Sequence, residues 1–187
     1  MPPAKSISCE VVEVILETER LLLRNWQLSD LNYYLALSTD VGYNCFTQPG
    51  RFLVRGDEEA AEKIQERITL FDERKLGKFP IFLKETGEFI GTCGMEPYQL
   101  DGQPEVEMGY RLCLKHWGRG YATEAGAAIL RYGFGDLNLK RIIAYALPQN
   151  TASLKVLEKL GGLYLRTFDH NELPHRLYDF PRKTFVI

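Results

Sequence analysis

The stretch HWGRGYATEA, residues 116–125, places two glycines around one arginine immediately before a run of good helix formers. The segment before it, EVEMGYRLCL at residues 105–114, is typical of a β-strand. Glycine lets a backbone approach a ligand that a Cβ would hold off, and a helix start presents unpaired N–H groups and a positive dipole end. This order predicts an α/β fold with an anion site at the loop, or else a plain corner between strand and helix.

The same residues argue against two common phosphate-binding loops. A Walker loop requires Gly-Lys followed by Ser or Thr, and the chain contains no such triplet. A dinucleotide fingerprint requires a third glycine where Thr123 stands and an acidic residue about 20 positions later. Residues 138–148 read NLKRIIAYALP and contain no acid. A nucleotide-binding oxidoreductase is therefore the weaker alternative.

Residue patterns elsewhere predict a mixed sheet around one core. Strands are expected in residues 9–26, 78–95, 105–114, 140–147, 163–168 and 176–187, and helices in 29–38, 56–75, 120–134 and 150–160. Residues 41–56 are predicted to form a loop, and Pro181 places the last strand at an edge or a bulge. We expect a single domain over residues 1–187, with residues 1–8 as a loose arm.

Composition limits the classes of function. A formal net charge of −2 provides no basic surface for nucleic acid, and no apolar run approaches the ~18 residues of a membrane span. No signal peptide is evident, which favours reduced cysteines and a cytoplasmic location. Neither cysteines nor histidines have the spacing of a metal site; they are Cys9, Cys45, Cys93, Cys113, His116, His170 and His175. The sequence leaves monomer and homodimer both open.

Four ordered motifs resemble the GCN5-related N-acetyltransferase (GNAT) family. They are ETERLLLRNWQLSD (17–30), KETGEFIGTCGM (84–95), LCLKHWGRGYATEA (112–125) and NTASLKVLEKLGG (150–162). Within the family they are most similar to the branch of ribosomal-protein N-terminal acetyltransferases (RimJ/RimL-like). The resemblance covers nearly the whole chain from about residue 17. It implies a GNAT-like acyl-CoA N-acyltransferase fold: a mixed, mostly antiparallel sheet of about 6–7 strands flanked by about 4 helices.

The resemblance implies acetyl-CoA as co-substrate, with no metal. Backbone amides toward its pyrophosphate would come from Gly118, Arg119, Gly120, Tyr121, Ala122 and Thr123. Asn150 and Ser153 match the positions that contact the pantetheine arm. Read without the family, Asn150 or Thr151 is a helix cap, and both interpretations can hold together. Arg119 adds charge to a phosphate or is an ordinary solvated loop residue.

An acetyl transfer also needs oxyanion stabilisation and a base. The resemblance places the oxyanion contact at the amides of Leu112, Cys113 and Leu114. Cys113 itself is expected to be a buried core thiol rather than a nucleophile, because the family transfers the acetyl group directly. Glu107 is the first candidate for the base, acting directly or through water. The alternative is an ion pair between Glu107 and Arg111, with Glu105 as the reserve base.

The leaving thiolate also needs a proton donor. Many family members have a tyrosine for this where Leu157 stands, so Ser153 is expected to act as the acid or to hold a water. Trp117 replaces a common Gln or Arg, and Gly162 replaces an aromatic residue that packs beneath the acyl site.

The remaining histidines are expected to be peripheral. His116 is predicted to be a surface loop residue. His170 and His175 are predicted either to line the acceptor entrance or, preferably, to lie in a surface loop.

The resulting hypothesis is an acetyl-CoA-dependent N-acetyltransferase that acts on a primary amine by direct transfer. The amine is a protein N-terminal α-amine or a small-molecule amine. The alternative is a sensor module that binds acetyl-CoA without turnover.

Overall fold

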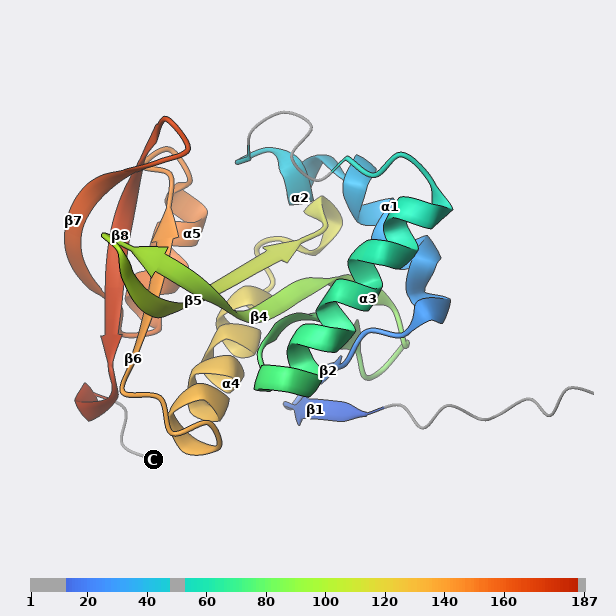
Figure 1. The fold of residues 1–187 in the computed structure, drawn as a ribbon, viewed down its shortest axis with the longest axis horizontal. Helices are drawn as coiled ribbons and strands as arrows, with labels where there is room; N and C mark the ends of the chain where they lie inside the picture. Colours follow the sequence, from blue (N-terminus) through green and yellow to red (C-terminus); the bar gives the residue numbers. More distant parts are fainter. Residues whose placement is uncertain (1–12, 48–52, 185–187) are drawn as a thin grey trace, which may run out of the picture.

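The computed structural model describes residues 13–47 and 53–184, which form one eight-stranded sheet with helices on both faces (Figure 1). The strands are β1 (Val14–Glu17), β2 (Leu21–Arg24), β3 (Gly77–Leu83), β4 (Phe89–Leu100), β5 (Gln103–Leu112), β6 (Arg141–Ala146), β7 (Leu163–His170) and β8 (Leu173–Pro181). The α-helices are α1 (Leu31–Thr39), α2 (Val41–Asn44), α3 (Asp57–Arg74), α4 (Tyr121–Gly135) and α5 (Thr151–Lys159). The predicted mixed, mostly antiparallel sheet is confirmed. The predicted arm at residues 1–8 lies outside the described residues.

Two local expectations were wrong. The segment 41–56, predicted as a loop, contains the single helical turn α2, whose cap is the Asp40 carboxylate accepting from the Tyr43 N–H. The last strand, predicted at an edge or a bulge, does not lie at an edge, because the strand order is β1-β2-β3-β4-β5-β6-β8-β7. Pro181 is tolerated there because it is the final residue of β8, opposite Arg141.

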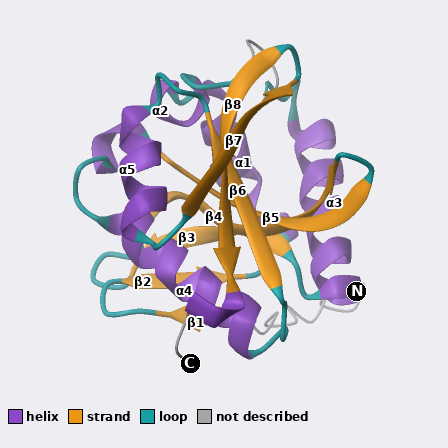
Figure 2. Cartoon of the chain, turned by 90° about the vertical axis from the view of Figure 1, so that its left-hand side faces the viewer, coloured by secondary structure: helices purple, strands orange, loops and turns teal. Residues whose placement is uncertain are grey.

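The helices divide between the two faces of the sheet (Figure 2). Helices α1 and α3 bury apolar side chains against Trp26, Phe82 and Phe89 on one face. Helices α4 and α5 supply Ile129, Leu157 and other apolar residues to the larger core on the opposite face. Within the described residues, no helix is long and apolar enough to cross a membrane.

The divergence of β5 and β6 positions the site. These two neighbours are the parallel pair of the sheet, and the pairing recorded between them is Glu107 with Ile143. Beyond that point β5 continues along β4 as far as Leu112, while β6 continues along β8 as far as Ala146. Because the strands are parallel, their carboxyl ends open at the same edge, where ligands of α/β sheets usually bind. Helices α4 and α5 both begin at this edge.

Candidate active site

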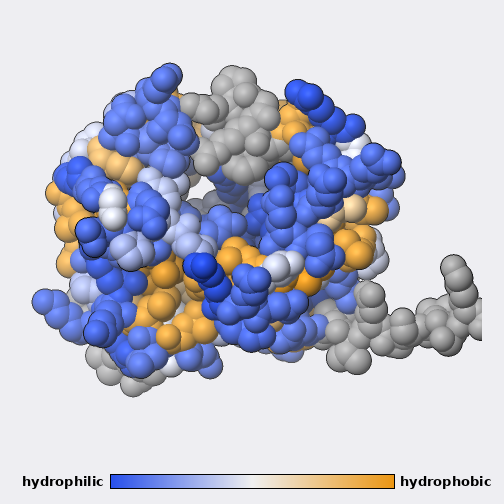
Figure 3. Space-filling view, in the orientation of Figure 1, coloured by the Kyte–Doolittle hydropathy of each residue, from blue (hydrophilic) through white to orange (hydrophobic). Residues whose placement is uncertain are grey.

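A cavity of about 500 Å³ lies where β5 and β6 separate. Figure 3 shows the molecule hollowed between the β6–β8 side and the α1–α3 side. Of the residues predicted to form the site, those that line the cavity are Glu107, Leu112, Gly118, Gly120, Tyr121, Ala122, Thr123, Asn150 and Ser153. Arg119, Cys113 and Leu114 are not among its lining residues. Its volume is that of an ordinary small-molecule site.

The glycine loop needs glycine for its backbone conformation. Gly118 has φ 73° and Gly120 has φ 81°, and a Cβ at Gly118 would meet open space. Helix α4 starts at Tyr121, and the described residues provide no side-chain cap for it. Its first intrahelical bond runs from the Glu124 N–H to the Gly120 carbonyl at 3.0 Å. The amides of the first turn are therefore left for an anionic ligand.

Arg20 holds this loop from outside the cavity. Its guanidinium donates to the Arg119 carbonyl at 3.1 Å and, through Nε, to the Glu124 carboxylate at 2.7 Å. Burial raises the pKa of Glu124, but hydrogen bonds from Thr18 and Arg20 outweigh it and lower the pKa overall. Arg119 itself is exposed. The groups that this loop presents to the cavity are thus backbone groups, and Arg20 fixes their position.

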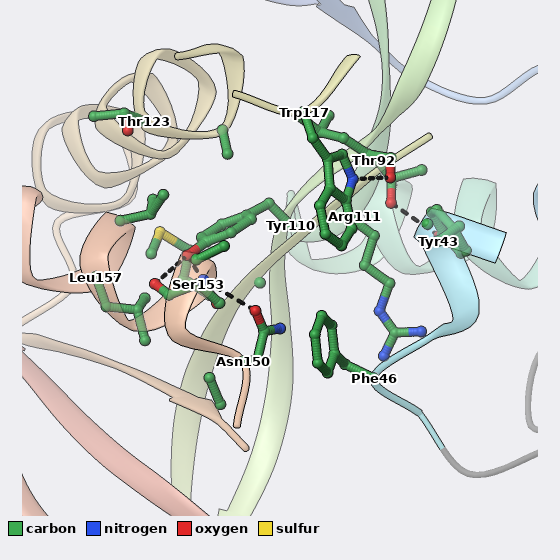
Figure 4. A pocket seen from close by; sticks show the side chains of 18 of the residues that line it. Tyr43, Phe46, Thr92, Tyr110, Arg111, Trp117, Thr123, Asn150, Ser153 and Leu157 are labelled. Carbon is green, nitrogen blue, oxygen red and sulfur yellow. Dashed lines mark hydrogen bonds between the residues drawn. The ribbon is translucent and has the colours of Figure 1, made fainter. Parts of the chain in front are cut away.

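The start of α5 carries the second predicted motif. The Asn150 side-chain oxygen accepts from the Ser153 N–H at 3.0 Å, which confirms the predicted cap. The Ser153 hydroxyl lies 3.0 Å from the Tyr110 hydroxyl of β5 (Figure 4). Asn150 and Ser153 both line the cavity, so the capping role and a ligand contact are compatible. Tyr110 was not predicted as a site residue.

The amides predicted for the oxyanion contact are partly engaged within the protein. The Cys113 N–H donates to the Ile90 carbonyl at 3.0 Å, and the Leu114 N–H donates to Asp40 at 3.3 Å. Leu112 is the member of this group that lines the cavity. Burial raises the pKa of the Cys113 thiol to about 11, and the side chain packs in the core of the α1–α3 side. This environment agrees with a core thiol.

Glu107 is bound by a residue that the sequence analysis did not consider. Its carboxylate lies 2.7 Å from Lys78 Nζ of β3, and both side chains are largely buried. The alternative prediction had placed Arg111 beside Glu107, and the structure places Lys78 there. A Cβ at Gly109 would lie 2.8 Å from both charged groups, so the bare backbone of Gly109 makes room for the pair. The reserve candidate, Glu105, pairs with Arg141 and is not a lining residue.

Further polar side chains surround Glu107 on the α3 side of the sheet. Arg67 of α3 lies 3.1 Å from Glu96 of β4, and Arg111 lies over the Tyr43 ring. These residues line the cavity, and of them the strand pattern had marked Arg111 as the alternative partner of Glu107. A charged residue within a buried strand, such as Lys78 in GKFPIFL, was the available signal.

The histidine predictions need correction. His116, expected on the surface, is 3% exposed because it packs beside the Tyr121 ring, with Nε2 3.5 Å from Glu88. Burial lowers the pKa of His116. His175, expected in a surface loop, is a buried residue of β8 that lines the cavity. Its Nδ1 lies 2.9 Å from the Leu173 carbonyl, which can only accept, so Nδ1 carries the proton.

The two departures in the second motif have structural explanations. Leu157 is 2% exposed within the main core and is chemically unable to donate a proton. A Cβ at Gly162 would lie 2.8 Å from the Phe180 ring. Phe180 of β8 thus fills the space beside Gly162. Among residues 13–47 and 53–184, no group of three His, Cys, Asp or Glu side chains could hold a metal.

Comparison with known proteins agrees with this arrangement. The profile of the Acetyltransferase (GNAT) domain matches residues 20–162. An uncharacterized N-acetyltransferase, p20 of Bacillus licheniformis, is 38% identical over 147 residues, which cover 78% of this chain and 80% of p20. The uncharacterized protein YkkB of Bacillus subtilis (strain 168) is 41% identical over 102 residues, and the alignment spans 54% of this chain and 58% of YkkB.

Solved structures share the same architecture. RimL, a ribosomal L7/L12 alpha-N-protein acetyltransferase in complex with coenzyme A, superposes with a TM-score of 0.76. The match covers 90% of this chain and 98% of RimL at 16% identity, so it supports the fold alone. The family match, by contrast, spans most of the chain and includes both the glycine loop and the start of α5. The chain therefore belongs to the GNAT family and is an acetyltransferase.

Proposed function

We propose that the protein transfers the acetyl group of acetyl-CoA to a primary amine. The acceptor is the N-terminal α-amine of a polypeptide or the amine of a small molecule. One observation supports this most strongly: the uncapped start of α4, the start of α5 and the Glu107 carboxylate all line one cavity. An anion site, a second helix start and a carboxylate are the groups that an acetyl-CoA-dependent transfer requires.

The residues present fit this co-substrate. GNAT acetyltransferases use acetyl-CoA, and the positive-φ loop at Gly118 and Gly120 leaves the first amides of α4 for its pyrophosphate. Asn150 and Ser153 would contact the pantetheine arm at the start of α5. The Leu112 N–H would donate a hydrogen bond to the carbonyl oxygen of the acetyl group.

The proposed transfer needs a group that takes the proton of the amine on one side of the site and a polar group beside the leaving sulfur on the other. Acetyl-CoA supplies an activated acetyl group, and Glu107 takes the proton that the attacking amine must lose. Lys78 holds the carboxylate in place before the acceptor arrives. Ser153 faces the leaving sulfur from the α5 side. Cys113 takes no part, because its thiol is buried with a raised pKa.

A protein that only binds acetyl-CoA is the competing function. Its motive is Leu157, which stands where the family resemblance implies a proton-donating tyrosine in many members. Ser153 and Tyr110 provide hydroxyl groups at the same cavity, which favours an active enzyme. Release of free CoA from acetyl-CoA, measured with and without a panel of amines and short peptides, separates the two. Amine-dependent release supports transfer, and binding without amine-dependent release supports a sensor.

The co-substrate site has its own test. We predict that Gly120→Asp lowers acetyl-CoA affinity at least tenfold, about 1.4 kcal/mol, because a carboxylate would face the pyrophosphate. Gly102→Asp is the control: Gly102 also has positive φ, but a Cβ there would meet open space, whereas one at Gly120 would lie 3.4 Å from Arg20 Nη2. Gly102 lies in the β4–β5 turn and does not line the cavity. Calorimetric titration of both variants measures the difference. Equal affinities would contradict the placement of the pyrophosphate.

A further inference from the structure

Positive side chains outnumber carboxylates on the wall of the cavity that α2, α3 and strands β3, β4 and β5 form. The charged residues that line this wall are Arg67, Lys78, Arg111, Glu96 and Glu107. Each carboxylate is already bound to a cation: Glu107 lies 2.7 Å from Lys78, and Glu96 lies 3.1 Å from Arg67. Within the described part of the chain, this wall therefore has a net positive charge. Such a wall favours a ligand group with a negative charge.

Arg111 lies on the side of the sheet from which an acceptor would enter. It shares a face of β5 with Glu107, whereas its neighbour Tyr110 points the other way, toward Ser153 (Figure 4). The Arg111 guanidinium lies over the ring of Tyr43, which belongs to the core of the α1–α3 face. The proposed contacts with acetyl-CoA come from α4 and α5, which cover the opposite face. The acceptor amine would therefore approach from the side of Arg111.

The guanidinium of Arg111 is positioned by buried neighbours. Its Cζ lies 5.6 Å from the centre of the Tyr43 ring, and Tyr43 Oη lies 3.0 Å from Thr92 Oγ1. Tyr43 and Thr92 are both buried, while Arg111 is half-buried and lines the cavity. A guanidinium stacked on an aromatic ring still presents a planar edge of N–H donors, and this edge matches the two oxygens of a carboxylate.

The proposed reaction takes place next to Arg111. The Leu112 N–H is the proposed donor to the acetyl oxygen, and Arg111 immediately precedes it in β5. The amine attacks the carbonyl carbon that this N–H polarises, so the amine must come close to residues 111–112. A group a few bonds from the amine is then within reach of a side chain as long as that of arginine. The acceptor, rather than coenzyme A, would supply that group.

We propose that Arg111 binds a carboxylate of the acceptor, so that the enzyme acts on primary amines that carry a carboxylate a few bonds from the nitrogen. This inference rests on the proposed acetyl transfer and narrows its acceptor. A free amino acid has this chemistry, and so does a polypeptide whose first residue is acidic. Arg111 takes no proton and forms no covalent bond. Because its contact is made in the bound substrate as well as in the transition state, Arg111 acts mainly on KM.

Acceptor pairs that differ only in the carboxylate test this inference. One arm pairs free L-amino acids with their primary amides. The other arm pairs C-terminally amidated peptides that begin with Asp or with Asn. The acid preference is the kcat/KM of the acid divided by that of its partner, measured by CoA release at saturating acetyl-CoA. Losses that affect both members equally cancel in this ratio.

We expect the acid preference of the wild-type protein to exceed that of Arg111→Gln about tenfold or more, chiefly through KM, because a charge-assisted hydrogen bond is lost. The arm with the larger difference identifies the source of the carboxylate. Arg111→Lys keeps the charge but not the planar fork, so it should give an intermediate preference. If Arg111→Gln does not fold, as judged by circular dichroism, a reduced preference in Arg111→Lys supports the inference and an unchanged one overturns it.

Arg166→Gln is the matched control. Arg166 also lies over an aromatic ring, 5.9 Å from the centre of Phe168, but it does not line the cavity. This variant should keep the wild-type preference. An equal fall in Arg166→Gln and Arg111→Gln would overturn the inference, because the effect would not belong to the cavity.

The remaining outcomes separate this inference from the proposed function. If amines are acetylated and the acid preference is the same in the wild-type protein and in Arg111→Gln in both arms, the carboxylate role is overturned while acetyl transfer stands. If acetyl-CoA binds and no amine of either arm or of the wider panel is acetylated, the proposed transfer fails, and this inference fails with it.

Discussion

Lys78 forms an ion pair with Glu107, and this contact determines how a catalytic-base role of Glu107 can be tested. The two charged groups are 2.7 Å apart, with side chains 15% and 13% exposed. Removing one partner of such a buried pair leaves the other charge unpaired, which is typically costly for stability. A variant of Glu107 alone therefore mixes a catalytic effect with a folding effect. A variant of Lys78 is needed beside it.

We predict that Glu107→Gln lowers turnover about 10²- to 10⁴-fold with little change in acetyl-CoA affinity, as expected for loss of a general base. The double variant Lys78→Met/Glu107→Gln removes both charges and should show a similar loss. Lys78→Met alone should retain more activity than either. The measurement is steady-state kinetics with the best amine from the panel. Equal losses in Lys78→Met and Glu107→Gln would instead indicate that the pair only orders the strands.

His116 should make stability depend on pH. Burial lowers its pKa below the unfolded value of about 6.5, so the unfolded chain binds more protons as the pH falls through that window. The contribution of neutral His116 is complete above pH 6.5 and is lost as the pH falls through its folded pKa. We predict that wild-type protein loses more unfolding free energy between pH 7.5 and 5.0 than His116→Gln. Urea unfolding measures this, and parallel pH curves would contradict it.

At the scale of elements, Asn150 at the start of α5 has two roles to separate: it caps the helix, and we propose that it contacts the pantetheine arm. Asn150 caps the helix through its side-chain oxygen, and the residue also lines the cavity. Capping is a property of the helix alone, and many small polar residues achieve it. A contact with pantetheine would require the longer amide. Substitution can therefore separate the two tasks.

We predict that Asn150→Ala lowers the unfolding free energy by about 1 kcal/mol and also weakens acetyl-CoA binding. Asn150→Ser restores a cap, so it should recover most of the stability and leave the affinity low. Thermal unfolding and calorimetric titration of the two variants measure these effects separately. If Asn150→Ser recovers affinity together with stability, Asn150 acts only as a cap.

At the scale of the whole molecule, ligand binding should stabilise both sides of the cavity together. The cavity is lined from α2, α3 and β3 on one side and from β6, α5 and β8 on the other. We predict that acetyl-CoA at 100 times its dissociation constant adds about 2.7 kcal/mol, an upward shift in Tm of roughly 5–10 °C. NADH and ATP serve as controls in the same thermal scan and should produce no comparable shift. A shift with none of the three would contradict the anion site.

Local patterns predicted most of the elements, and the reasons for the exceptions are specific. Helix α3 was recognisable because Ile64, Ile68 and Phe71 repeat on one face behind an acidic first turn. Helix α2 was missed because a single turn has no period to detect. The interior place of β8 was missed because sheet order depends on which strands pair, and Pro181 at a strand end carries no information about that order.

The candidate site was likewise predictable where it is formed by residues close together in the sequence. The loop at Gly118 and Gly120 and the cap at Asn150 are formed by neighbours in sequence, so spacing alone located them. Strand parity correctly placed Glu107 and Arg111 on one face of β5. It did not reveal that Tyr110, on the other face, also reaches the cavity. The cavity opens to both faces because β5 and β6 separate beyond Glu107 and Ile143.

The sequence by itself determined the class of fold, the glycine loop before an uncapped helix start, and the family, since each depends on residues close together in the chain. Only the tertiary structure decided which residues from distant parts of the chain come into contact. Lys78 and Glu107 are 29 residues apart, and Tyr110 and Ser153 are 43 residues apart. Such contacts follow from strand register and from the divergence of two strands. Neither the register nor the divergence can be read from the periodicity of one segment, because many strand pairings satisfy the same alternation of apolar and polar residues.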